Sequence, residues 1–284
     1  VMLCRRRVQE VSSTPPPQAS TSFAIRTEHE VSVEQNADIN TSSCSTVGGM
    51  RRILADISHK HYITSLPGLR ENVVQYAGHV NIDQAKNSNV FYWLIEAPSN
   101  ADKLPLLVWL NGGPGCSSMD GLWLELGPFR LDSTGKNINI NPHSWHNVAN
   151  LLIVDQPVGT GFAYTKSKAG YAKNDDMVNA QFYRFLMGFF DLHPRYLIDG
   201  GGSNNSLLKT RAFYMSGESH AGHYIPTIAL HIMRQNENLL KQQQQKQQQW
   251  SIPGTGSSSS TEGAIHISLE GLALGNPWMD PFHQ

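Results

Sequence analysis

Residues 216–222 read Ser-Gly-Glu-Ser-His-Ala-Gly and stand between an apolar run that suits a strand and a stretch that suits a helix. A nucleophile elbow occurs in this context, where a sharp turn holds a serine hydroxyl clear of the sheet. Gly217 lies two residues before Ser219 and Ala221 two residues after it. Their small side chains would allow neighbouring segments of the chain to pack closely around the turn. The helix would turn its free N–H groups and positive dipole end toward developing negative charge. The stretch predicts Ser219 as a nucleophile, although a plain serine-capped turn fits the same letters.

Apolar runs of strand length recur on both sides of this turn, at 90–95, 106–110, 151–154, 212–215 and 272–274. Several show no polar alternation, which favours strands buried on both faces of a sheet. A helix is predicted over 175–192, because this stretch opens with two aspartates and stops before Pro194. A second helix is predicted after Ser219, where isoleucines recur on one face. Strands that alternate with helices indicate an α/β fold.

Composition limits the class of protein. The 284 residues allow one large or two small domains, and 39% hydrophobic residues suffice for a core but are few for a wholly globular chain. A formal charge of −1 gives no basis for binding nucleic acid, and no apolar run is long enough to span a membrane. We expect residues 1–55 to be disordered and 56–284 to form the folded domain, with low-complexity loops near 200–206 and 241–262.

A glycine-rich stretch, Asn-Gly-Gly-Pro-Gly-Cys-Ser-Ser at 111–118, directly follows the predicted strand at 106–110. Glycine-rich sequence after a strand can bind phosphate, so a nucleotide site is a first rival interpretation. The stretch contains neither G-K-[ST] nor G-x-G-x-x-G, which argues against that rival. A loop in this place can instead supply a backbone N–H to an oxyanion hole.

Four stretches together resemble the serine carboxypeptidases (peptidase S10). They are Trp-Leu-Asn-Gly-Gly-Pro-Gly-Cys-Ser-Ser at 109–118, Glu-Leu-Gly-Pro at 125–128, Asp-Gln-Pro-Val-Gly-Thr-Gly-Phe at 155–162 and Gly-Glu-Ser-His-Ala-Gly-His-Tyr at 217–224. They occur in the family order, and Gly-Asn-Pro-Trp-Met-Asp-Pro at 275–281 is similar to the next family landmark. The resemblance covers roughly residues 60–284 and implies an α/β-hydrolase fold, a mixed, mostly parallel sheet with helices on both faces.

The resemblance implies a reaction. Ser219 would attack the last peptide bond of a substrate and form an acyl-enzyme that water releases. The backbone N–H groups of Gly113 and His220 would hold the oxyanion. His220 replaces the tyrosine usual in the family, which leaves the shape of the neighbouring subsite open.

Recognition of the substrate α-carboxylate would fall, by resemblance, to Asn111, Gly112, Glu125 and Glu218, with Trp109 packing behind them. Carboxyl groups that lie close together and partly buried are not all ionised, so one pKa rises and the protonated acid donates a hydrogen bond. We therefore expect peptide hydrolysis to be favoured at acidic pH.

Residues 116–121, Cys-Ser-Ser-Met-Asp-Gly, look most like the Kex-type pheromone-processing branch, which trims C-terminal Lys and Arg. Asp120 is the candidate for that specificity, although a solvent-facing or capping aspartate explains it as well. The expected partners are the C-termini of peptides or proteins, with no cofactor, metal, nucleic acid or membrane span. By resemblance the protein belongs to the secretory pathway, vacuole, lysosome or extracellular space, and glycosylation sequons stand at 40–42 and 204–206. No signal peptide is visible, so either the protein is not secreted or its true N-terminus precedes residue 1.

The family supplies its triad aspartate and histidine after the nucleophile, and neither motif appears before Gln284. The family partner of Cys116 would also lie beyond Gln284. We therefore expect an incomplete fragment, inactive and poorly soluble by itself because strand edges are exposed. The alternatives are an acyltransferase or lyase on the same scaffold, or a truncated remnant that binds peptides.

Overall fold

The computed structural model describes residues 58–69, 72–199, 207–250, 264–280 and 282–283. The predicted disordered segment 1–55, the predicted loop 200–206 and residues 251–262 of the other predicted loop lie outside the described residues, as do both sequons.

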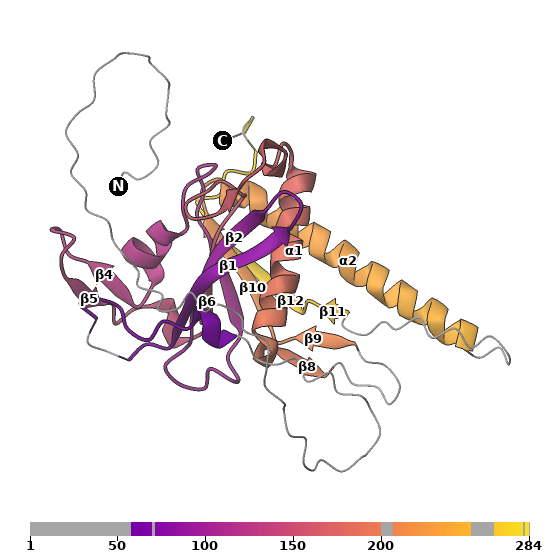
Figure 1. The fold of residues 1–284 in the computed structure, drawn as a ribbon, viewed down its shortest axis with the longest axis horizontal. Coiled ribbons are helices and arrows are strands. Elements are labelled where there is room, and N and C mark those ends of the chain that lie inside the picture. Colours follow the sequence, from indigo (N-terminus) through magenta and orange to yellow (C-terminus); the bar gives the residue numbers. More distant parts are fainter. Residues whose placement is uncertain (1–57, 70–71, 200–206, 251–263, 281, 284) are drawn as a thin grey trace, which may run out of the picture. The chain divides into compact units, whose positions relative to one another are not determined.

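One mixed sheet organises the described chain (Figure 1). Its strands follow the order β1 (Gln75–Asp83), β2 (Ser88–Ile95), β6 (Asn150–Asp155), β3 (Leu106–Leu110), β10 (Phe213–Glu218) and β12 (Leu269–Gly275), and β7 (Tyr164–Thr165) pairs with β2. Neighbours from β6 to β12 pair in parallel, whereas β2 is antiparallel to β1, β6 and β7. Among the described strands of this sheet only β2 therefore runs against the others, and the predicted mixed, mostly parallel α/β sheet is confirmed.

The five predicted strands are all present, as β2, β3, β6, β10 and β12. Every residue of β2 and of β6 is buried, as their unbroken apolar runs require. Strand β1 was not expected, because polar side chains interrupt its sequence and no regular pattern marks it. Its burial in the structure is equally irregular. The remaining short elements are β4 (Phe129–Leu131), β5 (Ile138–Ile140), β8 (Leu197–Asp199), β9 (Leu208–Thr210), β11 (Ile265–His266), η1 (Ser58–His61), η2 (Gly121–Leu126), η3 (Trp145–Asn147), η4 (Lys168–Gly170) and η5 (Pro194–Tyr196).

The two long helices follow the prediction in different degrees. Helix α1 (Asp175–Leu192) has the predicted bounds, and the Asn174 side chain caps it by accepting a hydrogen bond from the Met177 N–H at 3.0 Å. Helix α2 (Ala221–Trp250) begins just after Ser219, but it extends through the glutamine-rich stretch for which a loop was predicted. The loop prediction is wrong at 241–250, because Gln and Lys are good helix formers and the helix continues through them.

Each face of the sheet has its own core. On one face α1 and α2 lie side by side over Tyr92, Val108 and Met215 (Figure 1). On the other face the short π-helix η2 and strand β4 pack against Trp93 and Trp109. Both α-helices therefore share one face, and η2 supplies the helical cover of the other. None of the helices in the described ranges combines the length and apolar character needed to cross a membrane.

Candidate active site

The turn at Ser219 has the geometry of a nucleophile elbow. It joins the last residue of β10 to the start of α2, and Ser219 has a φ of +55°, a left-handed conformation that residues other than glycine rarely adopt. Its backbone N–H donates to the Gly275 carbonyl at 3.0 Å, and its carbonyl accepts from the N–H of Trp278 at 2.8 Å. These bonds to the end of β12 and to the segment after it hold the turn, while the exposed serine faces solvent.

The glycine-rich loop lies directly against this elbow. A Cβ atom placed on Gly112 would stand 2.6 Å from the His220 backbone nitrogen and 2.9 Å from Ser219 Cβ, so only glycine allows this close approach. An oxyanion hole needs two N–H donors, from two segments, converging on one point. The structure brings the two segments together as expected, while the roles of the Gly113 and His220 N–H groups stay predictions.

Asn111 gathers the two glutamates that were predicted to recognise a carboxylate. Its Nδ2 donates to Glu218 Oε1 at 3.1 Å and lies 3.4 Å from Glu125 Oε1. Its Oδ1 accepts from Trp109 Nε1 at 2.7 Å and from the Gly121 N–H at 3.1 Å. Because two donors occupy the oxygen, the amide nitrogen must face the glutamates. Residues from the ends of β3 and β10 and from η2 thus form one polar cluster beside the elbow.

The charges of this cluster favour retention of a proton. Burial raises the pKa of Glu125, and the neighbouring Glu218 and Asp120 carboxylates raise it further against the lowering effect of the Asn111 hydrogen bond. Burial also raises the pKa of Asp120, which precedes η2. The Asp120 side chain makes no capping hydrogen bond to η2 within the described residues, so the capping alternative finds no support.

Aromatic groups surround the side chain of His220. Its ring lies 5.1 Å from that of Trp278, at an interplanar angle of 31°, and 4.7 Å from that of Tyr224. Burial, and then the nearby His223, lower the pKa of His220. The ring that replaces the family's tyrosine therefore forms part of an aromatic wall next to the nucleophile.

No described histidine is hydrogen-bonded to the Ser219 hydroxyl. His223 Nε2 lies 3.1 Å from Asp175 Oδ2 at the start of α1, and His283 Nδ1 lies 2.5 Å from Asp280 Oδ2. In the described ranges no group of three or more His, Cys, Asp or Glu side chains is arranged to hold a metal ion.

Cys116, in the glycine-rich loop, is disulfide-bonded. The expected pairing with a cysteine beyond Gln284 stays a prediction.

Asp155 is a residue of the site that the sequence analysis quoted only as part of a motif. It ends β6, is fully buried, and accepts hydrogen bonds from the Ser117 hydroxyl at 2.8 Å, the Ser118 N–H at 2.9 Å and the Phe162 N–H at 2.8 Å. The sequence signal for this role was an aspartate directly after the apolar run 151–154. A buried charge at the end of such a strand needs hydrogen-bond donors from the adjoining loops.

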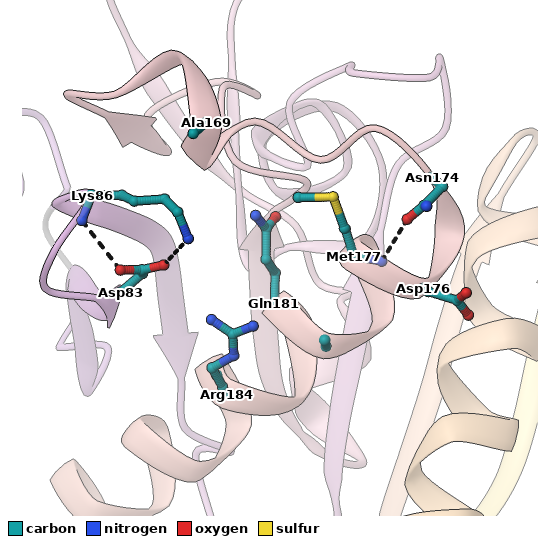
Figure 2. A pocket seen from close by; sticks show the side chains of 9 residues that line it. Asp83, Lys86, Ala169, Asn174, Asp176, Met177, Gln181 and Arg184 are labelled. Atoms are coloured by element: carbon teal, nitrogen blue, oxygen red, sulfur yellow. Dashed lines mark hydrogen bonds and ion pairs between the residues drawn. The ribbon is translucent and has the colours of Figure 1, made fainter.

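A pocket of about 220 Å³ lies elsewhere, between the turn after β1 and the first half of α1 (Figure 2). Its lining includes Asp83, Lys86, Gln181 and Arg184, and the Lys86 ammonium already pairs with Asp83 at 2.5 Å. None of the predicted site residues lines this pocket. The candidate site is therefore identified from the Ser219 elbow and its contacts.

Comparison with known proteins agrees with this geometry. The family model described as serine carboxypeptidase matches residues 67–284. The chain is 41% identical over 223 residues to the pheromone-processing carboxypeptidase KEX1 of Phytophthora infestans, which covers 77% of this chain and 32% of that protein. It is 38% identical over 229 residues to serine carboxypeptidase S10 family member 2 of Dictyostelium discoideum, covering 78% of this chain and 35% of that protein.

A solved structure is also similar, that of Kex1(delta)p, a prohormone-processing carboxypeptidase from Saccharomyces cerevisiae. The TM-score is 0.56 with 31% sequence identity, over 74% of this chain and 40% of that one. The chain thus spans about a third of the length of the curated relatives. The resemblance to the Kex-type branch is confirmed by these relatives, and the chain belongs to the serine carboxypeptidase family.

Proposed function

We propose that the whole protein is a serine carboxypeptidase that releases C-terminal residues from peptides and proteins. The observation that carries this proposal is the Asn111 amide, which holds Glu125 and Glu218 together beside the Ser219 elbow. A serine elbow alone suits many hydrolases and acyltransferases. A cluster able to bind a free α-carboxylate favours the peptidase over an acyltransferase or lyase, because the substrate of an exopeptidase always has that group.

In this mechanism the polar cluster binds the α-carboxylate of the substrate's last residue, and the elbow attacks the peptide bond on the other side of that residue. The terminal carboxylate accepts a hydrogen bond from protonated Glu125, and this fixes the last peptide bond over Ser219. The Ser219 oxygen attacks the carbonyl carbon, and its proton passes to a base, which in this family is a histidine oriented by an aspartate. Backbone N–H groups of Gly113 and His220 stabilise the developing oxyanion. The base returns the proton to the leaving nitrogen as the C–N bond breaks, the last residue departs as a free amine, and water then hydrolyses the acyl-enzyme.

The raised pKa of Glu125 supports a preference for acidic pH. Below this pKa the neutral acid donates to the substrate carboxylate. Above this pKa the ionised Glu125 faces the substrate carboxylate, and the repulsion between the two negative charges weakens peptide binding.

The surroundings of the site also support a basic side chain in the substrate. Asp120 lies close enough to Glu125 to raise the pKa of Glu125, so it is a second acidic group at this site with which a basic side chain can pair. We propose Asp120 as the group that would give a preference for C-terminal Lys or Arg, the preference that the resemblance to the Kex-type branch implies. Membership of this family likewise supports a place in the secretory pathway or vacuole.

The test compares Ser219→Ala with the unchanged protein on a peptide with a free C-terminus and on the same peptide amidated. We expect release of the last residue from the free peptide only, and a loss on the order of 10⁶-fold in turnover for Ser219→Ala. Ser167→Ala, at the cap of η4, is the matched control and should keep full activity. Equal cleavage of both peptides would refute carboxylate recognition, and binding of the free peptide without turnover would support a peptide-binding remnant instead.

A further inference from the structure

The carboxylate of Asp155 divides its hydrogen bonds between two loops. Oδ1 accepts from the Ser117 hydroxyl and the Ser118 N–H, both in the glycine-rich loop after β3. Oδ2 accepts from the Phe162 N–H, in the loop after β6. Each oxygen therefore holds one loop. No lysine or arginine among the described residues forms an ion pair with Asp155. Burial raises the pKa of its carboxyl group, and the donors from Phe162, Ser117 and Ser118 oppose this rise.

The loop held by Oδ1 leads directly to the carboxylate-binding cluster. Ser118, whose N–H is bound to Asp155, also accepts the Asn111 N–H on its hydroxyl at 3.1 Å. The Cys116 N–H donates to the Gly112 carbonyl at 3.2 Å, which closes the loop within itself. The positions of the Asn111 amide and of Gly112 against the elbow thus depend on where Ser118 is held.

The loop held by Oδ2 closes over the carboxylate. A Cβ atom on Gly161 would stand 2.1 Å from Asp155 Oδ2 and 2.7 Å from Ser117 Oγ, so the two loops meet with no space for a water molecule. The Phe162 ring packs on Phe91 of β2, with ring centroids 5.0 Å apart, and this anchors the second loop to the sheet. A lost bond at Asp155 cannot be replaced by solvent without movement of a loop.

We propose that Asp155 is a positioning residue of the reaction: by holding one loop with each oxygen, it fixes the Asn111 amide and the oxyanion-hole backbone relative to Ser219. Asp155 touches neither the substrate nor the reacting atoms, and it acts through Ser117 and Ser118. Its catalytic consequence rests on the proposed peptidase function. Its structural part, the joining of the two loops, does not.

Asp155→Asn is the isosteric test. The asparagine keeps one acceptor oxygen but turns an NH₂ group toward a donor, either the Phe162 N–H or the Ser117 and Ser118 donors, so one loop is released. Ser117→Ala is the milder variant, because it removes one of the three bonds to Asp155 and leaves the Ser118 N–H in place. It also removes the acceptor of the Met119 N–H, at 3.2 Å. Asp132→Asn is the matched control: Asp132 also accepts several hydrogen bonds, but in the exposed turn between β4 and β5.

We expect Asp155→Asn to lower kcat and raise KM, with a fall in kcat/KM of up to about 10²-fold per folded molecule. Ser117→Ala should change both constants in the same direction by less, and Asp132→Asn should change neither. A carboxylate that only stabilises the fold would lower the melting temperature and leave both constants of the folded enzyme unchanged. That outcome would overturn the proposal.

Hydrogen exchange of backbone amides is the second measurement, and it requires no peptidase activity. Asp155→Asn should speed the exchange of the Ser118, Asn111 or Phe162 amides, and Ser117→Ala that of Ser118, relative to Asp132→Asn. Unchanged exchange at all three amides would show that Asp155 does not hold the loops, and the proposal fails. If the unchanged protein releases no C-terminal residue, the proposed function fails, and the exchange result alone decides whether Asp155 joins the loops.

Discussion

At the scale of single residues, the site depends on one amide and two acids that are far apart in sequence. Asn111 meets Glu125 and Glu218, which no local spacing pattern can pair, so these residues were predicted only through the family resemblance. Their convergence follows from the sheet, where β3 and β10 are parallel neighbours and end at the same edge. Asp155 was likewise quoted in the sequence analysis only as part of a family motif. Its role could not be predicted, because the donors from Ser117 and Phe162 become neighbours only after folding.

The raised pKa of Glu125 gives a prediction about pH. In the unchanged enzyme KM for a peptide should rise as pH increases through this pKa, because the ionised acid repels the substrate carboxylate. Glu125→Gln keeps a neutral donor at every pH, so its KM should stay nearly constant from about pH 4 to 8. Steady-state kinetics on a free and an amidated peptide would check this, with Glu270→Gln on the exposed part of β12 as control. A flat profile in the unchanged enzyme would contradict the idea.

The close contact of Gly112 gives a second prediction. In Gly112→Ala the added Cβ would stand 2.6 Å from the His220 nitrogen, so the loop must move away from the elbow. We expect a loss of about 10²- to 10³-fold in kcat, the usual effect of losing one oxyanion-hole donor. Gly271→Ala is the control, since its Cβ would stand 3.3 Å from the Tyr214 ring and far less movement is needed. Unchanged turnover in Gly112→Ala would show that this loop does not shape the oxyanion hole.

At the scale of elements, prediction succeeded where apolar residues were continuous or strictly periodic. The buried strands β2 and β6 were found on this basis, whereas helix α1 was found from its two opening aspartates and the proline that follows it. Strand β1 was missed because neither alternation nor an unbroken apolar run marks it, and its pairing with β2 decides its conformation. The helical state of 241–250 was missed because a glutamine run is compositionally ambiguous. It becomes helical here as the continuation of an existing helix, which avoids the cost of a new nucleus.

The N-terminal cap of α1 gives a prediction at this scale. Asn174→Ala removes the acceptor for the Met177 N–H and should lower the free energy of unfolding by about 1 kcal/mol. Asn174→Ser offers a hydroxyl oxygen in the same place and should restore most of the loss. Urea unfolding followed by circular dichroism would measure both variants. Equal midpoints for the alanine variant and the unchanged protein would mean that the bond contributes nothing.

At the scale of the whole molecule, the site exists because four parallel strands end at one edge. β3 is followed by the glycine-rich loop, β6 ends at Asp155, β10 leads into the elbow, and β12 leads to Trp278, whose N–H binds the Ser219 carbonyl. Ligand sites of open α/β sheets lie at the carboxyl ends of their strands. Here four of the five family stretches begin at such an end, and the exception is 125–128, which begins in η2. The sequence order of the motifs could therefore predict that they meet. It could not predict how their side chains divide the hydrogen bonds.

The outer edge of the same sheet gives the last prediction. Within the described residues β12 pairs only with β10, and Leu272 in its centre is 43% exposed. An exposed apolar edge strand is a template for pairing with another chain, and a lysine on such a strand opposes that pairing. In residues 1–284 expressed alone we therefore expect association, and Leu272→Lys should raise the monomer fraction in size-exclusion chromatography. Val148→Lys changes a side chain that is 66% exposed but not on the edge, so it should have no effect. A monomeric, cooperatively unfolding 1–284 chain, or equal gains from both lysine variants, would show that the β12 edge does not drive association.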